Sequence, residues 1–479
     1  MASVSKKSRT IQSRKWRDFC RRFIITVIYV SVWAGFAFAA IKVDEARGDT
    51  QGLNDGSAGE IPVMEIFLKD VTLGEVHENG KDVKYKDNVV ILDGVEYDGV
   101  EFKGRGNFSW TADKKSYRIK FGEKVSLLGM NKSKKWALVA NSVDDSLMRN
   151  DLAQYLMGLL VDDYPFRGEF VELKIDGEEL GVYYLIRTME IGKEAVNLSD
   201  PMGVLMELDN AYCLEEEKQY WTANGDCLAV KNVVADDNVE MAANDFVKDF
   251  DALEKAAKVG DYEEIEELID TESFAKYFIV AEMASDPDAY VTSWFMYKDG
   301  VEDKIHAGLA WDYDAAFGNH KWGEMTWPEE FYAPTAKIVR MEYAFDKTDE
   351  NKFCNYSSEL VMTSGSVGIS RLVCEMMDVP EFREAVSKVY SEKIMGREDE
   401  ILRHIDARAK LLSEAAKKDA ELWEKGDFWS EVEYLKWWMN ERMKFFEENY
   451  VLSFGGGTAA RADEGDAPAK VDDVEPEGF

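Results

Sequence analysis

The chain is poor in cysteine, histidine and proline for its length. Its 479 residues include five cysteines, four histidines and nine prolines. So few cysteines exclude a disulfide-built scaffold, and a zinc site is not expected without a Cys-x-x-Cys pair or closely spaced histidines. Hydrophobic residues nevertheless make up 46% of the sequence, which is enough for a packed core and excludes global disorder.

Positive charge is also scarce. The sequence holds 58 Lys and Arg against 93 Asp and Glu, a formal net charge of −35. Nucleic acid is therefore not an expected partner, because a phosphate backbone requires a basic face. The Gly-x-x-x-x-Gly-Lys-Ser/Thr pattern is absent, which excludes a P-loop nucleotide site. Such acidity favours solubility and a basic protein partner.

The basic residues that do occur are concentrated at the N-terminus. Residues 1–42 hold nine Lys or Arg and one Asp, a local charge of +8, which leaves −43 on the remainder. An uncharged apolar run follows over residues 23–41. This order is typical of a signal peptide or an N-terminal membrane anchor, and Ala37-Phe38-Ala39 offers a cleavage site. Both outcomes stay open, and each predicts an extracytoplasmic protein, secreted or anchored to the plasma membrane.

Four cysteines lie beyond Cys20 of this leader: Cys213, Cys227, Cys354 and Cys374. They form an even set in a compartment that permits disulfides. Cys213 and Cys227 could bridge a hairpin-like excursion of the chain. Reduced, buried thiols are an equally good interpretation of the same residues.

The chain divides into a linker, one large domain and a tail. Residues 43–60 are rich in Gly, Asp and Ala and predict a linker, and residues 455–479 predict a disordered acidic tail. The domain over residues 61–454 changes character along its length. A β-rich lobe is expected over about residues 61–238 and a helical lobe over about residues 239–454.

Alternating apolar residues between Gly, Asp and Asn turns predict short strands. These are Ile61–Leu68, Val89–Leu92, Val100–Lys103, Tyr117–Phe121, Trp136–Ala140, Glu169–Ile175, Gly181–Arg187, Val204–Leu208, Cys227–Val230, Ser293–Lys298 and Ile305–Ala310. Amphipathic spacing predicts helices. These are Asp144–Leu160, Phe246–Ala257, Tyr262–Leu268, Ser273–Ala284, Leu360–Met377, Pro380–Ala416 and Trp429–Glu447.

The segment after the last predicted strand carries the strongest chemical signal. Asp312 and Asp314 follow Ile305–Ala310, in a turn closed by Gly318 and Asn319. Acids two residues apart on extended backbone project to one side, where they repel each other unless a cation lies between them. A hard divalent metal prefers such oxygen ligands. An acidic surface turn is the alternative, but the neighbouring aromatic residues indicate a packed site.

The run from Trp311 to Asn319, Trp-Asp-Tyr-Asp-Ala-Ala-Phe-Gly-Asn, resembles the metal-binding signature of the CotH family of spore-coat-type atypical protein kinases. Seven further motifs follow the family's order over about residues 60–450. They are Lys103–Trp110 with Lys114–Phe121, Leu127–Met130, Lys135–Asn141, Ser146–Asn150, Phe170–Leu173, Gly181–Leu185 and Gly203–Asp209.

The resemblance implies an α+β, two-lobed atypical protein-kinase-like fold with a β-rich N-terminal half and a helical C-terminal half. It implies transfer of the ATP γ-phosphoryl group to Ser or Thr of an extracytoplasmic protein, with Mg²⁺ or Mn²⁺. Asp312 matches the family's metal-binding aspartate, and Asp314 is a second ligand or a structural residue. Asp288 matches the catalytic-loop aspartate, whereas Asp286 is better interpreted as a turn residue. Ser293 stands where ordinary kinases place a metal-binding asparagine.

Four basic residues in the matched motifs are candidate phosphate contacts: Arg105, Lys115, Arg118 and Arg149. Lys115 and Arg118 lie three apart and would point to opposite faces of a strand, so only one of them is expected to meet nucleotide. For Arg149, a structural ion pair is the favoured interpretation. Glu190 and Glu207 are acids in matched strands that could orient a lysine.

Two other functions fit the same residues. A surface scaffold or adhesin would keep the fold without catalysis, and a phosphoester hydrolase would use the acids on water. The presence of Asp288 and Asp312 favours the kinase over the scaffold. The hydrolase lacks a histidine cluster or a second set of metal ligands.

Overall fold

The computed structural model describes residues 60–286, 288–319, 328 and 370–448. The predicted leader and acidic tail, and almost all of the predicted linker, lie outside these residues. Cys20 and Cys354 do so as well. None of the described helices is long and apolar enough to cross a membrane.

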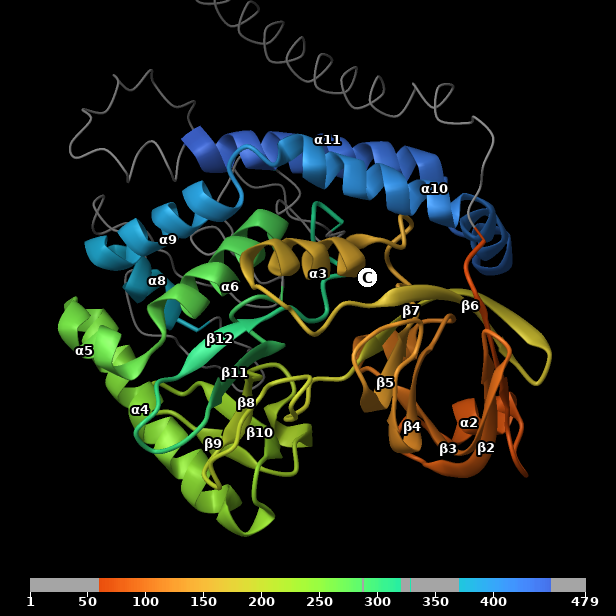
Figure 1. Ribbon diagram of the computed structural model, residues 1–479, viewed down its shortest axis with the longest axis horizontal. Helices are drawn as coiled ribbons and strands as arrows, with labels where there is room; N and C mark the ends of the chain where they lie inside the picture. Colours follow the sequence, from red (N-terminus) through yellow and green to blue (C-terminus); the bar gives the residue numbers. More distant parts are fainter. Residues whose placement is uncertain (1–59, 287, 320–327, 329–369, 449–479) are drawn as a thin grey trace, which may run out of the picture.

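The N-terminal part of the domain is a closed barrel (Figure 1). Its strands, in spatial order, are β1 (Val63–Phe67), β2 (Tyr85–Leu92), β3 (Val95–Arg105), β4 (Ser116–Val125), β5 (Ser133–Val139), β7 (Glu178–Arg187) and β6 (Glu169–Ile175). The parallel pairing of β1 with β6 closes the barrel, and the other neighbours are antiparallel. Alternate residues such as Phe102, Tyr117 and Trp136 fill a separate apolar core inside it.

A second, five-stranded sheet lies beside the barrel (Figure 1). Its order is β12 (His306–Leu309), β11 (Trp294–Lys298), β8 (Val204–Leu208), β10 (Cys227–Val233) and β9 (Gln219–Trp221). The central strand β8 is buried throughout. Strands on both sides of the expected lobe boundary near residue 238 therefore pair within one sheet, because β11 returns to β8 after three helices.

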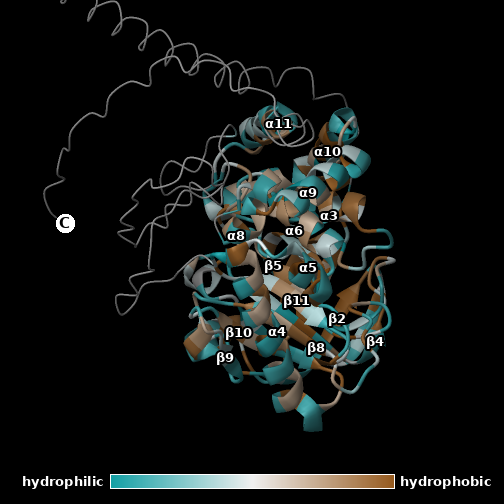
Figure 2. Ribbon diagram, turned by 90° about the vertical axis from the view of Figure 1, so that its left-hand side faces the viewer, coloured by the Kyte–Doolittle hydropathy of each residue, from teal (hydrophilic) through white to brown (hydrophobic). Residues whose placement is uncertain are grey.

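Nine α-helices lie in the part of the chain that the structure describes, and most of them lie on the side of the second sheet (Figure 1). They are α2 (Leu73–Asn79), α3 (Arg149–Leu160), α4 (Val239–Val259), α5 (Tyr262–Leu268), α6 (Thr271–Ala284), α8 (Leu372–Asp378), α9 (Pro380–Lys393), α10 (Glu398–Trp423) and α11 (Phe428–Phe446). Only α2 belongs to the barrel; α3 and α6 lie between the sheet and the α10–α11 pair (Figure 1). In Figure 2, α4, α10 and α11 alternate between hydrophobic and hydrophilic residues, as amphipathic helices do.

The fold contains both sheets and helices, as an α+β class requires. The predicted boundaries of two helices are wrong. The helix expected over Pro380–Ala416 is two helices, because the chain turns at Gly396, whose φ is +80°. The helix expected from Asp144 begins at Arg149, because the Asp144 carboxylate accepts the N–H groups of Ser146 and Arg149 and holds a turn instead.

A buried ion pair joins the barrel to α10. Lys114 Nζ lies 2.5 Å from Asp419 Oδ1 and donates to the carbonyl oxygen of Val182 at 2.6 Å. Burial lowers the pKa of Lys114 to about 7, although the charge of Asp419 opposes this shift. The Asp419 carboxylate also accepts the N–H of Val182, so the pair connects α10 to β7 as well as to the start of β4.

Lys114→Met tests this joint. The variant leaves the buried Asp419 carboxylate with only the longer ion pair to Lys425, at 3.7 Å, and we expect it to lower the free energy of unfolding by about 3 kcal/mol. Lys417→Met, at an exposed position of the same helix, should change stability little. Urea unfolding of the three proteins measures the difference. Equal midpoints for Lys114→Met and wild type would show that the pair does not hold the barrel to α10.

A second buried pair consists of two acids. Glu254 on α4 and Asp226, which precedes β10, are 2% and 8% exposed, and their side chains are hydrogen-bonded. Burial, and then the charge of Asp226, raise the pKa of Glu254 to about 8. Burial raises the pKa of Asp226 as well. At neutral pH the two carboxyl groups therefore share a proton.

The shared proton makes stability depend on pH. Glu254 titrates near 4.5 when unfolded and near 8 when folded, so the free energy of unfolding should fall as pH rises from about 4.5 to about 8. Glu254→Gln stays neutral throughout. We expect the difference in free energy of unfolding between this variant and wild type to grow across this window, to on the order of 2 kcal/mol in favour of the variant at pH 8. Thermal unfolding at pH 5 and pH 8, with the exposed Glu267→Gln as control, measures the difference; a difference that is the same at both pH values would contradict it.

Candidate functional site

Helix α3 holds the acidic turn that follows β12. Gln154 Nε2 donates to the carbonyl oxygen of Ala310 at 2.7 Å, and Asn150 Oδ1 accepts the N–H of Tyr313 at 2.8 Å. Between these two anchors, Asp312 adopts a φ of +70°, in the left-handed region that non-glycine residues rarely enter. The anchors therefore impose a strained conformation on the residue predicted to bind metal.

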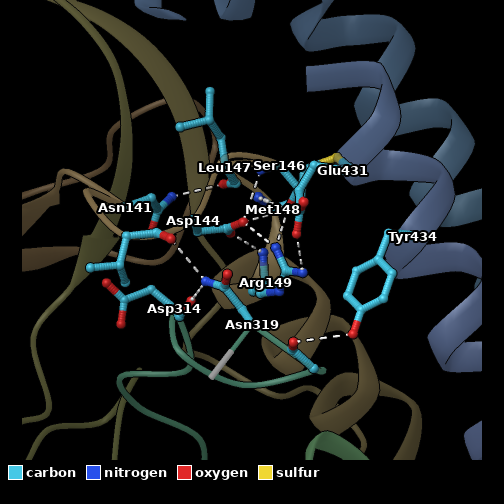
Figure 3. A network of polar contacts seen from close by, with 12 residues as sticks. Asn141, Asp144, Ser146, Leu147, Met148, Arg149, Asp314, Asn319, Glu431 and Tyr434 are labelled. Atoms are coloured by element: carbon cyan, nitrogen blue, oxygen red, sulfur yellow. Dashed lines mark hydrogen bonds and ion pairs between the residues drawn. The ribbon is translucent and has the colours of Figure 1, made fainter. Parts of the chain in front are cut away.

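The far end of the turn is attached to the neighbouring helix and loop. Phe317 donates its N–H to the carbonyl oxygen of Ala284, the last residue of α6, at 2.6 Å. Figure 3 shows Asn319 Nδ2 between two carbonyl oxygens, those of Asp314 at 2.7 Å and Val143 at 3.0 Å. Asp314 is thus placed by its main chain, and its carboxylate is left for other interactions.

Arg149 lies in a structural network beside this turn. Its guanidinium is 0% exposed and lies 2.5 Å from Asp144 and 2.7 Å from Glu431 (Figure 3). Two acids already neutralise the side chain, so it is not placed to meet a phosphate. The structural ion pair favoured from the sequence is the arrangement observed.

The loop after α6 supplies two more carboxylates. Asp286 is 2% exposed, and its Oδ1 accepts the N–H of Asp288 at 3.3 Å, so it acts as the expected turn residue. The carbonyl oxygen of Asp288 in turn accepts the N–H groups of Val291 and Thr292. Pro287 lies outside the described residues. The Asp288 carboxylate accepts no hydrogen bond from any described residue.

The four acids influence one another strongly. Burial, then the charges of Asp312 and Asp209, raise the pKa of Asp288 to about 7. Burial, then mainly the charge of Asp312, raises the pKa of Asp314 to about 8. Burial and Asp288 raise the pKa of Asp286 well above its ordinary value. One buried and three half-buried carboxylates that repel one another constitute a site for positive charge.

Arg105, at the end of β3, is a cation that interacts with these acids from the barrel side. The charges of Asp312 and Asp314 oppose the lowering of its pKa by burial, and its guanidinium lies 5.2 Å from the ring centroid of Trp311. A cavity lined by Arg105, Trp311 and Asp312 has a volume of about 10 Å³. That is room for one water molecule, so a nucleotide would have to lie outside it.

Arg105 belongs to a basic face on the outside of the barrel, formed by Lys103, Arg105, Arg118, Lys120 and Lys135. Strand register places Lys103 directly opposite Arg118, and Lys120 directly opposite Lys135. Burial, and then the charge of Arg118, lower the pKa values of Lys103 and Lys135. Glu101, opposite Lys120, and Asp82, 3.4 Å from Lys103, offset part of this charge. Like charges opposite each other destabilise a sheet, so the remaining cations favour a bound anion.

Lys115 lies apart from the basic face. Its Nζ donates to the carbonyl oxygens of Trp110 and Ala112 at 2.9 and 2.8 Å. Lys115 and Arg118 therefore point in different directions, as their spacing predicts, and Arg118 is the one that shares a face with Arg105. The pKa of Arg118 is lowered by burial, and further by the neighbouring charge of Arg105, whereas Glu101 raises it.

Carboxylates suit Mg²⁺ or Mn²⁺, but those of the described residues do not form a cage around Asp312. Within the described part of the chain, three acids whose ligand atoms lie within 4.8 Å of one another occur at Glu207, Asp209 and Glu216. Lys231 forms ion pairs with two of these acids, with Glu207 and, at 2.7 Å, with Glu216. Asp312 and Asp314 fit a different arrangement, in which one or two carboxylates share Mg²⁺ with phosphates and water.

Several residues of the site could not be assigned from the sequence. Asp209 lies in a matched motif, yet only the structure brings it close to Asp288. The period-two spacing of Lys103 and Arg105 on one strand, and of Arg118 and Lys120 on the next, was the available signal for the basic face. Which strands pair could not be read from that spacing, so Lys103 and Lys135 were missed.

Comparison with known families bears on this arrangement. No curated protein matches the chain. The family model described as CotH kinase protein matches residues 102–446, which include the basic face, Asp288 and the turn with Asp312 and Asp314. The match covers most of the chain and confirms the resemblance found in the motifs, so this protein belongs to the CotH kinase family.

Proposed function

We propose that the protein is an exported, Mg²⁺-dependent protein kinase that transfers the γ-phosphoryl group of ATP to Ser or Thr of an extracytoplasmic protein. One observation carries the proposal. Three carboxylates, Asp288, Asp312 and Asp314, lie at the end of a basic face on an otherwise strongly acidic molecule. Phosphoryl transfer needs cations for the phosphates, acids for a metal and a carboxylate for the hydroxyl.

The basic face would bind the phosphates of ATP. Arg105 is close to the acids, and Arg118 and Lys103 extend the positive charge along the barrel. The nucleotide would lie over this open face, since the cavity beside Arg105 holds a single water. Arginine suits phosphate because its guanidinium donates two parallel hydrogen bonds. Each phosphate contact would also relieve the repulsion between neighbouring cations.

Asp312 and Asp314 would hold Mg²⁺, or Mn²⁺ in its place. When bound, the metal would neutralise phosphate charge. Asp288 would accept the proton of the substrate hydroxyl. Burial is the main cause of its raised pKa, and a pKa raised toward the ambient pH suits a general base. The loop hydrogen bonds of its main chain leave the carboxylate available for a substrate.

The proposed location follows from the basic and apolar leader of residues 1–42, either cleaved or retained as an anchor through residues 23–41. The net charge of −35 favours a basic, Ser-rich protein as substrate. Nucleic acid is not a proposed partner for the same reason.

Phosphate transfer can be tested with the purified full chain, γ-labelled ATP, and Mg²⁺ or Mn²⁺. We expect label on the protein or on a basic Ser-rich acceptor. Asp312→Asn, Asp288→Asn or removal of the metal should each reduce labelling at least 100-fold. The exposed Asp98→Asn serves as control. Free phosphate without labelled protein would favour the hydrolase, and no transfer together with no nucleotide binding would favour the scaffold.

The basic face can be tested separately. Arg118→Ala should raise the KM for ATP about tenfold, which corresponds to loss of one charge-assisted contact of about 1.4 kcal/mol. Lys115→Ala should leave the KM within about twofold, because that ammonium faces carbonyl oxygens at the barrel end. Initial rates over a range of ATP concentrations distinguish the two. The reverse ranking would move the phosphate site to Lys115.

A further inference from the structure

We propose that the Cys213–Cys227 disulfide positions the Asp288 loop, so that breaking it lowers the rate of phosphate transfer. This inference rests on the proposed kinase function. The bond joins η3 (Cys213–Glu215) to β10, and both cysteines are buried. The sequence left open whether these two cysteines form a bridge or stay reduced, and in the structure they form a bridge. What matters for function is the set of contacts that leads from Cys227 to the catalytic loop.

The first step of this path joins Cys227 to the end of β8. The N–H of Cys227 donates to Asn210 Oδ1 at 2.8 Å, and its carbonyl oxygen accepts the N–H of Asp209 at 2.9 Å. Asn210 Nδ2 donates to Asp226 Oδ1 at 2.7 Å. The residue that carries the disulfide therefore sets the position of both Asp209 and Asn210.

The second step joins those two residues to the loop of Asp288. Asn210 donates its N–H to the carbonyl oxygen of Val291 at 2.7 Å, and Thr292 Oγ1 donates to Asp209 Oδ1 at 2.9 Å. Val291 and Thr292 each donate an N–H to the carbonyl oxygen of Asp288. Only these short hydrogen bonds separate the disulfide-bonded strand from the main chain of the proposed base.

The other end of the disulfide faces the site as well. Tyr212, next to Cys213, donates its N–H to the same Asp209 Oδ1 at 2.9 Å. Burial, then the charges of Asp288 and Asp312, raise the pKa of its phenol, so the ring lies near both acids. Glu215 forms an ion pair at 3.3 Å with Lys81 of the barrel. The disulfide thus holds a segment that contacts the acids and the barrel together.

Reduction should loosen this segment without unfolding the sheet. A dithiol would give two electrons and two protons to the S–S bond, which would break to two thiols as the reductant became a disulfide. The main-chain pairing of β8 with β10 runs from Leu228 to Val233, beyond Cys227, and would keep these strands together. Asp209 and Asn210 would then be less fixed, and Asp288 with them. In an oxidising compartment the disulfide would persist and keep the site assembled.

The experiment compares the full chain, oxidised and treated with dithiothreitol, with the variant Cys213→Ser/Cys227→Ser. We expect kcat to fall about tenfold on reduction, because small displacements of a catalytic group are costly. The KM for ATP should stay within about threefold, since the basic face lies on the barrel. The serine variant should match the reduced protein, and dithiothreitol should not change it further.

The hydroxyl contact of Thr292 offers a matched pair of variants. Thr292→Ser keeps the hydroxyl and should retain activity, whereas Thr292→Val keeps the shape and should lose about tenfold in kcat at an unchanged melting temperature. Equal kcat for oxidised and fully reduced protein would overturn the proposal. So would an undiminished response to dithiothreitol in the serine variant, since that response would belong to the disulfide of Cys374.

A second readout separates this inference from the kinase proposal. Hydrogen exchange across residues 286–293 should become faster on reduction, whether or not label is transferred. If the oxidised protein transfers no phosphate, the kinase proposal fails, and the exchange result still tests the path. Unchanged exchange in a protein shown to contain the two free thiols would refute the positioning role itself.

Discussion

Repulsion among buried carboxylates near the end of β12 is the constraint on which the rest of the structure depends. Besides burial, the charge of Asp312 contributes to the raised pKa values of Asp286, Asp288 and Asp314, and Arg105 interacts with Asp312 and Asp314 from the barrel side. Such a cluster persists only when the surrounding elements force it together. The main chain is constrained as well, because Asp312 is held in the left-handed region with a φ of +70°.

Separate parts of the fold share this task. Helix α3 holds the start of the acidic turn through Asn150 and Gln154, α6 holds its far end, and β8 holds the Asp288 loop through Asp209. The barrel supplies the opposing charge from its outer face, and the Lys114–Asp419 pair joins that barrel to α10. The two charge signs therefore come from different structural units and meet between them.

The barrel face next to the acidic turn is positively charged, although the chain as a whole is strongly acidic. A chain of net charge −35 places pairs of cations directly opposite each other on β3, β4 and β5. Asp82 and Glu101 offset part of the positive charge, but burial and neighbouring cations still lower the pKa values of Lys103 and Arg118. An anion carrying a divalent metal would relieve both repulsions at once, which is the physical reason that nucleotide phosphates suit this place.

The sequence alone determined the local features. Period-two alternation located most strands, and two acids after a buried strand marked the acidic turn, because both signals lie within a few residues. Only the tertiary structure decided the different directions of Lys115 and Arg118, the contact of Asp209 with Thr292, the partners of Arg149 and the Cys213–Cys227 bond. The strand pairings and most of the contacts behind those assignments join residues far apart in the chain, where spacing carries no information about distance.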